Sequence, residues 1–478
     1  MSENLYYPYT KSNMGIYNAI DKYLLLPSAD LLFGSTLTTQ LRVLKASEFI
    51  SQEEMQSIQN DKLSRLIKHC YETVPYYHKL FLKYGIKPEE IRDKKDLERI
   101  PILTKQIIRD NYDDLFSSTV NPSQRKYAST GGSTGTPLKY CMDKREWSLQ
   151  RASSFRAWES YGIHLGDKFF SLAGSSLTKK GQLLTSKGLY DRVIMRNHKY
   201  SSVNVDTESM ETLLQEFKRI KPRVVRGYGS SLVVFARYLD SIGYKPDTVQ
   251  VVLTTGEVLL PNYRRELERI FNAPVYDAYG AGDGGIVSHE CVNHRLHITE
   301  ELCMIEITDK DGHVLPDGRI GYVTSTDLEN YVFPFIRYQV GDMSSISTDP
   351  CSCGRHTRYF GEVMGRAGRL VYNKQGVPIS PTALPMMLYP DLDYHKTENQ
   401  SLYNKIDRFQ IRQDNKGDIQ ILLKLKDKAE ENDQFSYICT NFENQFTGSQ
   451  VTLSFVDEIP VLPSGKEDYC ISDYKLYD

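Results

Sequence analysis

The apolar positions in the first 120 residues recur with the period of an α-helix. Between residues 61 and 77, the apolar side chains fall at intervals of one, three and four residues: Leu63, Leu66, Ile67, Cys70 and Val74. This spacing places them on one face of a helix. Proline at positions 101 and 122 interrupts the pattern that follows. This part of the chain is therefore predicted to be mainly helical.

Between about residues 205 and 280, short apolar runs alternate with amphipathic segments. The expected helices cover 208–220, 230–242 and 261–271, and the last has proline near its first turn. The expected strands cover 223–226, 248–253 and 275–278. Strands that alternate with helices of this length indicate βαβ units and a mostly parallel sheet. The predicted fold class is therefore α/β.

Beyond residue 295 the pattern changes to strands and turns. Strands are expected over 304–308 and 321–326, then a hairpin over 409–425, a helix near 434–446 and a strand over 451–456. We therefore expect two domains. A large N-terminal domain, 1–365, would contain mostly parallel sheets and helices, and a small, mobile α+β C-terminal domain would cover 366–478.

The composition is that of an ordinary globular protein. The 478 residues include 40% apolar and 25% charged residues, and 59 Lys and Arg against 61 Asp and Glu give a net charge of −2. This balance argues against a fibrous or disordered chain, and against a nucleic-acid binder that works through bulk positive charge. The chain lacks a secretory pattern and an apolar stretch of about 18 residues. We therefore expect a cytoplasmic protein without membrane insertion.

A segment rich in glycine and hydroxyl groups, STGGSTGTP, covers residues 129–137. Its glycines let the backbone turn sharply and bring several N–H groups toward one anion, while the hydroxyls add donors. It is not a Walker loop, because no Gly-Lys-Ser/Thr follows. The alternative is a flexible Ser/Gly connection.

This segment resembles the phosphate loop of adenylate-forming enzymes, the superfamily of acyl-CoA synthetases, luciferases and peptide-synthetase adenylation domains. Within it, the chain most resembles the phenylacetate–CoA ligase-like family, including its capsular polysaccharide biosynthesis branch. Further motifs follow in that family's order and extend over roughly residues 60–470. The resemblance implies that ATP phosphates contact the first seven residues of the loop: Ser129, Thr130, Gly131, Gly132, Ser133, Thr134 and Gly135.

Two motifs resemble the adenine side of the nucleotide site. Thr254-Thr255-Gly256-Glu257 stands at the end of a predicted strand, where open α/β sheets place ligands. In the second motif, 277–283, the resemblance implies nucleotide contacts from Asp277, Ala278, Tyr279 and Gly280. Tyr279 would stack on adenine, and Asp277 would accept from its amino group. The alternatives are a plain βα loop and a tyrosine strand that ends in a glycine-rich turn.

Asp283 stands at the position where the family commonly has a glutamate that holds magnesium. Its shorter side chain would bind the cation directly or through water. Asp342 closes the segment FPFIRYQVGD, which resembles a strand ending in Gly-Asp. The resemblance implies that this carboxylate accepts hydrogen bonds from both ribose hydroxyls, a task suited to an acceptor-only group.

The C-terminal motifs resemble a hinge and a catalytic loop. In GRAGR, 365–369, Arg366 would lie near the nucleotide, and Gly368 and Arg369 replace the acidic residue that most relatives carry at the pivot. Lys466 ends the loop LPSGK, whose lysine serves adenylation in the family. A cation that bridges the attacking carboxylate and the α-phosphate stabilises the charge that develops there. The alternative is an exposed lysine in a turn.

A separate set of cysteines and histidines has metal-ligand character. Cys291 and His297 are six residues apart, and Cys351 and Cys353 follow as a Cys-Ser-Cys pair. Three thiols and one imidazole suit tetrahedral Zn²⁺, and four protein ligands leave no open position, so the site would be structural. Members of the family have a zinc site of similar spacing. His289 or His294 would be alternatives to His297, and two unrelated reduced cysteine pairs remain the other interpretation.

Together these features predict an AMP-forming ligase. It would activate a carboxylic acid as an acyl-adenylate with release of pyrophosphate, and Lys466 and Asp283 would be its catalytic residues. Coenzyme A is the acceptor that the resemblance implies by default. Alternatives are an amide or ester ligase acting on a sugar or uronic acid in polysaccharide biosynthesis, and a non-catalytic nucleotide-binding protein.

The expected cofactors are ATP, Mg²⁺, structural Zn²⁺ and, for a thioester product, coenzyme A. The expected partners are a small carboxylic acid and an acyl acceptor, with no nucleic acid, and a homodimer is left open. The acyl pocket is expected near residues 228–231 and 278–284, by analogy with the family.

Overall fold

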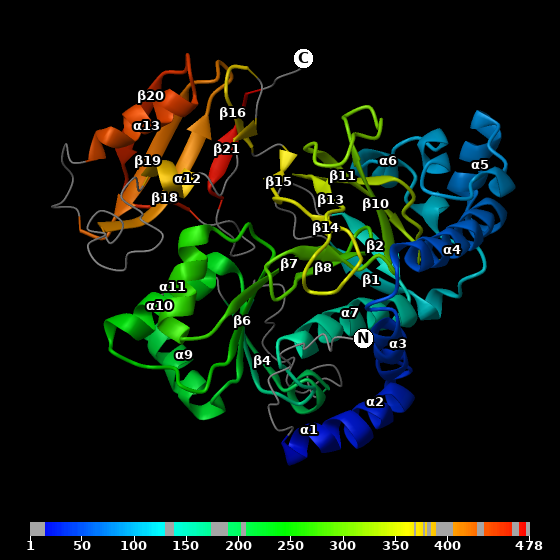
Figure 1. Cartoon of the computed structure of the whole chain (residues 1–478), viewed down its shortest axis with the longest axis horizontal. Coiled ribbons are helices and arrows are strands. Elements are labelled where there is room, and N and C mark those ends of the chain that lie inside the picture. Colours follow the sequence, from blue (N-terminus) through cyan, green and yellow to red (C-terminus); the bar gives the residue numbers. More distant parts are fainter. Residues whose placement is uncertain are drawn as a thin grey trace, which may run out of the picture.

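The computed structural model describes residues 15–129, 138–173, 190–201, 207–367, 370–375, 378–379, 384–388, 405–427, 435–460 and 468–474. A large part built from the N-terminal and central residues carries a smaller, C-terminal part on one side (Figure 1). Among the described residues, no helix is long and apolar enough to span a membrane.

The N-terminal region is helical, as its apolar period predicts. Its α-helices are α1 (Ile16–Ile20), α2 (Leu26–Phe33), α3 (Leu37–Ala46), α4 (Gln52–Thr73), α5 (Pro75–Tyr84) and α6 (Lys105–Asp110). A π-helical turn, η1 (Asp21–Leu25), joins α1 to α2. Short 3₁₀ turns follow at η2 (Pro88–Glu90), η3 (Asp96–Arg99), η4 (Asp113–Leu115) and η5 (Pro122–Gln124).

The predicted helix over 61–77 is in fact two helices. Helix α4 ends at Thr73, Val74 is extended, and α5 begins at Pro75. A residue that precedes proline is disfavoured in the α-region, and proline is well placed in the first turn of a new helix. The helical spacing of the apolar residues therefore continues past the point where the backbone leaves the helix.

The largest sheet has nine strands in the order β13-β14-β9-β8-β7-β6-β5-β3-β4. Its strands are β3 (Phe169–Ala173), β4 (Asn197–Ser201), β5 (Val224–Gly227), β6 (Val251–Thr255), β7 (Val275–Ala281), β8 (Ile286–Glu290), β9 (Leu296–Ile298), β13 (Ile346–Ser347) and β14 (Tyr359–Phe360). Strands β4, β3, β5, β6 and β7 are parallel, and pairing from β7 through β8 to β13 is antiparallel.

Helices cover both faces of the parallel half of this sheet. They are α7 (Lys144–Ser160), α9 (Thr207–Ile220), α10 (Gly229–Ser241) and α11 (Pro261–Phe271), with a π-helical turn η8 (Tyr190–Ile194). Val225 packs with the apolar faces of α9, α10 and α11, whereas its neighbour Val224 packs on the opposite face with Trp158 of α7. The alternation of side chains along a strand produces these two layers.

A second sheet is antiparallel throughout. It consists of β10 (Cys303–Thr308), β11 (Gly321–Asp327), β12 (Tyr338–Ser344) and β15 (Gly365–Arg366). A separate hairpin joins β1 (Lys126–Ser129) and β2 (Lys139–Met142). The α/β class is confirmed, with more antiparallel pairing than we expected, because only the βαβ segment before residue 281 has the crossover helices that parallel strands require.

The smaller part has a four-stranded mixed sheet in the order β20-β19-β18-β21. Its elements are β16 (Val371–Tyr372), β17 (Pro378–Ile379), α12 (Leu384–Leu388), β18 (Ile406–Gln413), β19 (Ile419–Leu425), α13 (Tyr437–Gln445), β20 (Val451–Phe455) and β21 (Cys470–Ser472). The predicted hairpin is therefore confirmed. Tyr469 lies beside Tyr263 of α11, with 6.1 Å between ring centroids. The boundary at 365/366 stays a prediction; it falls within β15, which pairs with β12.

A buried ion pair holds the segment that leads into β12. Arg337 is 2% exposed and has a φ of +49°. Its guanidinium donates to both carboxylate oxygens of Glu306, at 3.1 Å each, and to the carbonyl oxygens of Ile100 and Gly312. These bonds connect β12 to β10 and to the chain before α6. The charge of Arg337 is therefore fully used in holding three segments together.

We expect Arg337→Met to lower the free energy of unfolding by about 3–5 kcal/mol, because it leaves the Glu306 carboxylate buried without its partner. Chemical denaturation of the full chain measures this change. Arg99→Met, which removes an exposed partner of Glu90, is the matched control and should have a much smaller effect. Equal losses in the two variants would contradict the role of the Arg337 pair.

Candidate active site

Two cavities meet on the last parallel strand of the large sheet, β7. Cavity A, of about 330 Å³, and cavity B, of about 300 Å³, are both lined by Ala278, Tyr279 and Gly280. Strand β7 pairs in parallel with β6 and antiparallel with β8, so the sheet changes direction here. Open sheets place ligands at the carboxyl ends of their parallel strands, where such changes occur.

Cavity A gathers residues from four separate motifs. Eight residues that the motifs predict for nucleotide binding line it: Gly256, Glu257, Asp277, Ala278, Tyr279, Gly280, Asp342 and Arg366. They come from the turn after β6, from β7, from β12 and from β15. Segments that are as much as 110 residues apart in the chain therefore converge on one cavity.

Asp342 is bound from two sides. Its Oδ2 accepts a hydrogen bond from the Tyr279 hydroxyl at 2.9 Å, and its Oδ1 lies 3.1 Å from Nε of Arg366. Gly341 and Asp342 lie inside β12 rather than at its end, because β12 continues to Ser344 beside β11. Gly341 adopts a φ of +90°, which a residue with a side chain rarely adopts.

Tyr279 lies between the two cavities. Burial, together with the neighbouring Asp342 carboxylate, raises the pKa of its hydroxyl well above the ordinary value, so the hydroxyl stays protonated and donates. Its ring meets Phe360 edge to face, with 5.1 Å between centroids. Phe360 lines cavity A, and no motif pointed to it.

Asp277 is a half-buried carboxyl in the wall of cavity A. Its Oδ1 accepts from the Thr254 hydroxyl at 2.6 Å, and its backbone N–H donates to Glu290 at 3.0 Å. Burial raises the pKa of Asp277 to about 7, and the charge of Glu290 adds to this rise, while Thr254 and Arg264 oppose it. The side chain is therefore close to half protonated at neutral pH.

The turn after β6 is connected to helix α10. Gly256 has a φ of +81°, and the Glu257 carboxylate accepts from both the backbone N–H and the hydroxyl of Ser230, at 3.1 and 2.8 Å. Cavity A is also lined by Arg264, whose Nη2 donates to Glu290 at 2.6 Å. Such contacts join distant segments, so no local signal in the sequence pointed to Arg264 or Glu290.

Asp283 lies apart from both cavities. It is 5% exposed, and its Oδ2 accepts from the Tyr338 hydroxyl at 2.8 Å. Burial raises the pKa of Asp283, and the positive charge of Lys105 is the largest opposing influence. Its neighbour Gly282 lines cavity B, but Asp283 lines neither cavity.

Most of the predicted phosphate loop and the predicted catalytic lysine lie outside the described residues. Of the loop, Ser129 is described; it ends β1 and pairs with Lys139 of β2. The other six predicted residues, Thr130 to Gly135, lie outside the described residues. Lys466 is likewise not described, but Asp468, two residues further on, lines cavity A.

Cavity B lies between α7 and the sheet. Its walls include the aromatic rings of Trp147, Phe155 and Trp158 and the polar groups of Arg226 and His289. The lining agrees with the expected acyl pocket at Ala278, Tyr279, Gly280 and Gly282. The expected segment 228–231 does not line the cavity, because Ser230 is turned toward Glu257.

The predicted metal ligands form a compact cluster. The ligand atoms of Cys291, His297, Cys351 and Cys353 all lie within 4.8 Å of one another. The sulfurs of Cys291 and Cys351 are 3.7 Å apart, and Nε2 of His297 is 3.4 Å from the sulfur of Cys353. A zinc tetrahedron has edges of roughly 3.8 Å between sulfurs and about 3.6 Å between sulfur and nitrogen.

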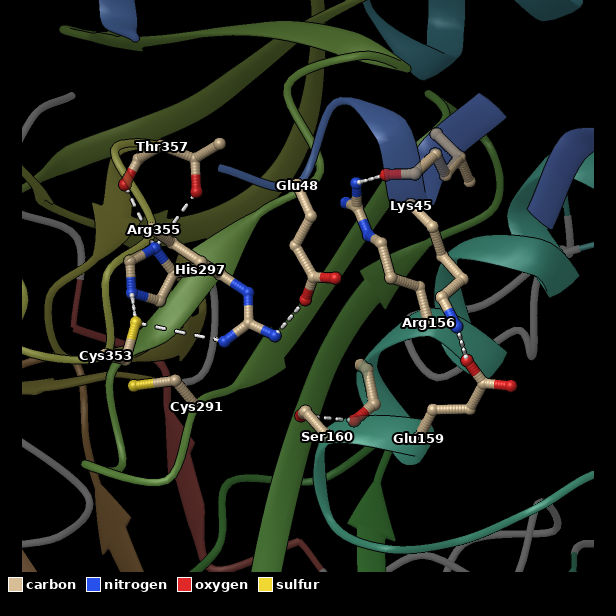
Figure 2. A network of polar contacts seen from close by, with 12 residues as sticks. Lys45, Glu48, Arg156, Glu159, Ser160, Cys291, His297, Cys353, Arg355 and Thr357 are labelled. Carbon is tan, nitrogen blue, oxygen red and sulfur yellow. Dashed lines mark hydrogen bonds and ion pairs between the residues drawn. The ribbon is translucent and has the colours of Figure 1, made fainter. Parts of the chain in front are cut away.

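The surroundings of the cluster orient its histidine (Figure 2). Nδ1 of His297 lies 3.0 Å from the carbonyl oxygen of Thr357, so a proton on Nδ1 leaves the lone pair of Nε2 facing the sulfurs. Arg355 donates to the Cys353 sulfur and to Glu48, which connects the cluster to the N-terminal helices.

The structure also separates His297 from its two alternatives. His289 lines cavity B, and Nδ1 of His294 lies 3.1 Å from Glu290. Strands β8 and β9 place His297 opposite His289, and β14 places Tyr359 opposite His297. The pairing of these strands therefore brings His297, and neither of the other two, to the cysteines.

Several known proteins are similar to this chain in sequence. No family model matches it. A phenylacetate-coenzyme A ligase of Thermus thermophilus is 27% identical over 350 residues, which cover 71% of this chain and 76% of that protein. The corresponding ligase of Escherichia coli is 28% identical and covers 70% of this chain and 76% of its own length. Protein CapK of Staphylococcus aureus is 21% identical, over 87% of this chain and 89% of its own.

Solved structures share the fold. A 2-hydroxyisobutyryl-CoA ligase in complex with 2-HIB-AMP, in its postadenylation state, superposes with a TM-score of 0.73 at 18% identity, over 89% of this chain and 91% of its own. An anthranilate CoA ligase in complex with anthranoyl-AMP gives a TM-score of 0.52 at 13% identity, over 72% of this chain and 65% of its own. The two-part architecture is therefore that of known acyl-adenylate-binding ligases.

We expect Asp277→Asn to stabilise the chain increasingly as the pH rises from about 4 to 7. The wild-type carboxyl has a higher pKa in the folded chain than in the unfolded chain. The free energy of unfolding of the wild type therefore falls as the pH rises from the ordinary pKa of 3.8 toward 7. The amide does not ionise. The difference in unfolding free energy between the variant and the wild type should grow by at most about 1.4 kcal/mol per pH unit and level off above pH 7. Urea denaturation across this range measures it, and a constant difference would contradict a raised pKa of Asp277.

Proposed function

We propose that this chain, which belongs to the adenylate-forming superfamily, uses ATP to activate a carboxylic acid as an acyl-adenylate and then transfers the acyl group to the thiol of coenzyme A. One observation carries the proposal. Residues from four motifs converge on cavity A, and this cavity shares three residues of β7 with cavity B. A nucleotide in the first cavity and an acid in the second would therefore meet at Ala278–Gly280.

Adenosine suits cavity A. The Asp342 carboxylate has about four acceptor positions, of which Tyr279 and Arg366 use two, so ribose hydroxyls can donate to the others. The Tyr279 ring offers a flat face for adenine, held by its hydrogen bond to Asp342 and its contact with Phe360. The backbone N–H groups and hydroxyls of 129–135 would bind the phosphates.

The first step joins the acid to the nucleotide. A carboxylate oxygen of the acid attacks the α-phosphorus, a new P–O bond forms, and the bond to the bridging oxygen breaks as pyrophosphate leaves. We assign to Lys466 the stabilisation of the negative charge that develops at this phosphorus. In the second step the thiol sulfur attacks the acyl carbon, its proton passes to solvent, and AMP leaves.

Magnesium accompanies ATP in this superfamily and would offset phosphate charge. In this arrangement Asp283 does not fit as a direct ligand, because its carboxylate is buried, lines neither cavity and accepts from Tyr338. A contact through water, the alternative that its short side chain suggested, agrees better with its place beside Gly282, and no step above depends on it.

We assign the cluster of Cys291, His297, Cys351 and Cys353 to a structural zinc ion. The distances between ligand atoms suit a tetrahedron, and the Thr357 carbonyl selects the histidine tautomer that binds metal. Four protein ligands leave no position for a substrate. The ion would tie the turn after β8 to the loop before β14, at the antiparallel end of the large sheet.

A second candidate function keeps the first step and changes the acceptor. The similarity to CapK extends over 87% of the chain, more than the similarity to the phenylacetate ligases. The second candidate is transfer of the acyl group to a sugar amine or hydroxyl, which the resemblance to the capsular polysaccharide biosynthesis branch implies. Formation of a thioester with coenzyme A, compared with formation of an amide or ester with a sugar, separates the two.

We expect carboxylate-dependent exchange of radioactive pyrophosphate into ATP, and a loss of this exchange by a factor on the order of 10²–10³ in Lys466→Ala. The test panel contains arylacetates, hydroxy acids, amino acids, uronic acids, fatty acids and dicarboxylic acids. Lys416 is an exposed residue in the turn between β18 and β19 of the smaller part. Lys416→Ala is therefore the control and should keep full exchange. ATP binding without exchange for any acid would instead favour a non-catalytic nucleotide-binding protein.

We expect the purified chain to contain about one zinc ion per molecule, and Cys351→Ser to lose most of it. Elemental analysis measures the metal, and thermal denaturation with and without a chelator measures its contribution to stability. Cys439→Ser changes a half-buried thiol outside the cluster and should keep the metal. A metal-free wild type that a chelator does not destabilise would refute the zinc site.

A further inference from the structure

Arg226 occupies an unusual position for a charged residue. It lies in the central parallel strand β5, between Ser171 of β3 and Leu253 of β6. Strands of parallel sheets are covered on both faces and are usually apolar along their length. The neighbouring residues Val224 and Val225 follow this rule. A guanidinium at position 226 therefore opposes folding unless something compensates its charge.

Arg226 is half-buried where it lines cavity B. Several buried or half-buried arginines in the described part of the chain have a carboxylate partner. Arg337 pairs with Glu306, Arg358 with Glu300 and Arg156 with Glu301. Among the described residues, no carboxylate lies within ion-pair distance of Arg226, and its guanidinium carbon lies 5.5 Å from the centroid of the Trp158 ring. Burial correspondingly lowers its pKa, and no nearby carboxylate opposes this shift.

The guanidinium lines cavity B, together with further unused donors. Nη1 of Arg151 and the hydroxyl of Ser288 are buried without a hydrogen-bond partner in the described structure. His289 lines the same cavity. None of the described residues that line this cavity is aspartate or glutamate.

The other walls of cavity B suit the carbon skeleton of a small acid. Trp147, Phe155 and Trp158 form its apolar side, and Ala278, Tyr279 and Gly280 form the end shared with cavity A. The volume of about 300 Å³ exceeds the roughly 150 Å³ that holds a benzene ring in an engineered protein cavity. A molecule there can therefore extend from β7 to Arg226.

We propose that the acid activated by this chain carries a second anionic group, most simply a second carboxylate, and that Arg226 binds that group in cavity B. This inference rests on the proposed function, because it identifies cavity B as the acyl site. One carboxylate of the acid reacts with the α-phosphate, and the other keeps its charge and its hydrogen bonds to Arg226. The second anionic group of the substrate therefore supplies the negative charge that Arg226 does not find among the described residues.

The experiment measures pyrophosphate exchange with pairs of acids that differ only at the far end, such as glutarate with valerate and adipate with hexanoate. The wild type is compared with Arg226→Met, which is apolar and unbranched, with Arg226→Lys, which keeps the charge, and with Arg269→Met, an exposed control on α11. Calorimetric binding of each acid, without ATP turnover, is measured in parallel. Thermal denaturation verifies that each variant is folded. Arg226→Met removes a half-buried charge that has no ion-pair partner among the described residues, so it should not destabilise the chain.

We expect the wild type to prefer the diacid of each pair, and Arg226→Met to lower kcat/KM for the diacid by roughly 10- to 100-fold, as the loss of a charge-assisted hydrogen bond does. The monoacid should change by less than about threefold, and Arg226→Lys should recover part of the preference. Arg269→Met should behave as the wild type.

Each other outcome decides the question. Exchange with monoacids alone, unaffected by Arg226→Met, would overturn this inference and leave the proposed function in place. An increase in the KM for ATP with every acid would mean that Arg226 binds phosphate, which also overturns it. Diacid binding that depends on Arg226, without exchange for any acid, would support the inference about the cavity and overturn adenylation. Neither binding nor exchange would overturn both.

Discussion

The double pairing of strand β7 is the constraint on which both cavities depend. It runs parallel to β6 on one side and antiparallel to β8 on the other, so the chain reverses direction between residues 281 and 286. Gly284 and Gly285 make this reversal with φ angles of +147° and +68°, and a side chain at Gly285 would meet Asp327 at 2.5 Å. The resulting register places His289 opposite Ala278. Strand β7 therefore presents Ala278, Tyr279 and Gly280 to both cavities, and its antiparallel neighbour β8 adds Ser288 and His289 to cavity B.

The two cavities differ in the charge of their linings. Among the described residues, six acidic side chains and two arginines line cavity A, whereas two arginines and no carboxylate line cavity B. Oxygen acceptors in the first suit the hydroxyl and amino donors of a nucleoside, and donors in the second suit an anion. Both linings include Tyr279 of β7, so the acidic lining and the basic lining lie on either side of this one strand. This difference in charge would orient two substrates toward each other.

The cysteine and histidine cluster lies at the antiparallel end of the same sheet. Cys291 stands in the turn that follows β8, His297 lies in the short β9, and Cys351 and Cys353 stand in the loop that precedes β14. Short strands contribute few ladder hydrogen bonds, so a closed metal site at this edge would hold their register. Arg355 extends the support to Glu48 between α3 and α4. The position of His289 in cavity B thus depends on contacts around the neighbouring turn.

Local signals in the sequence determined much of the fold and the membership of the candidate site. The apolar runs at β5 and β6 and the proline that begins α11 identified the βαβ units, and the ordered motifs identified eight residues that converge on cavity A. The roles of those residues, and of Lys466, stay predictions.

Tertiary structure decided what depends on partners distant in the chain. The break at Val74 follows from backbone sterics before proline, which apolar spacing does not reveal. The choice of His297 among three nearby histidines follows from strand register. The isolation of Arg226 is visible only in three dimensions, because the sequence shows a charge in a strand but not whether any carboxylate lies beside it.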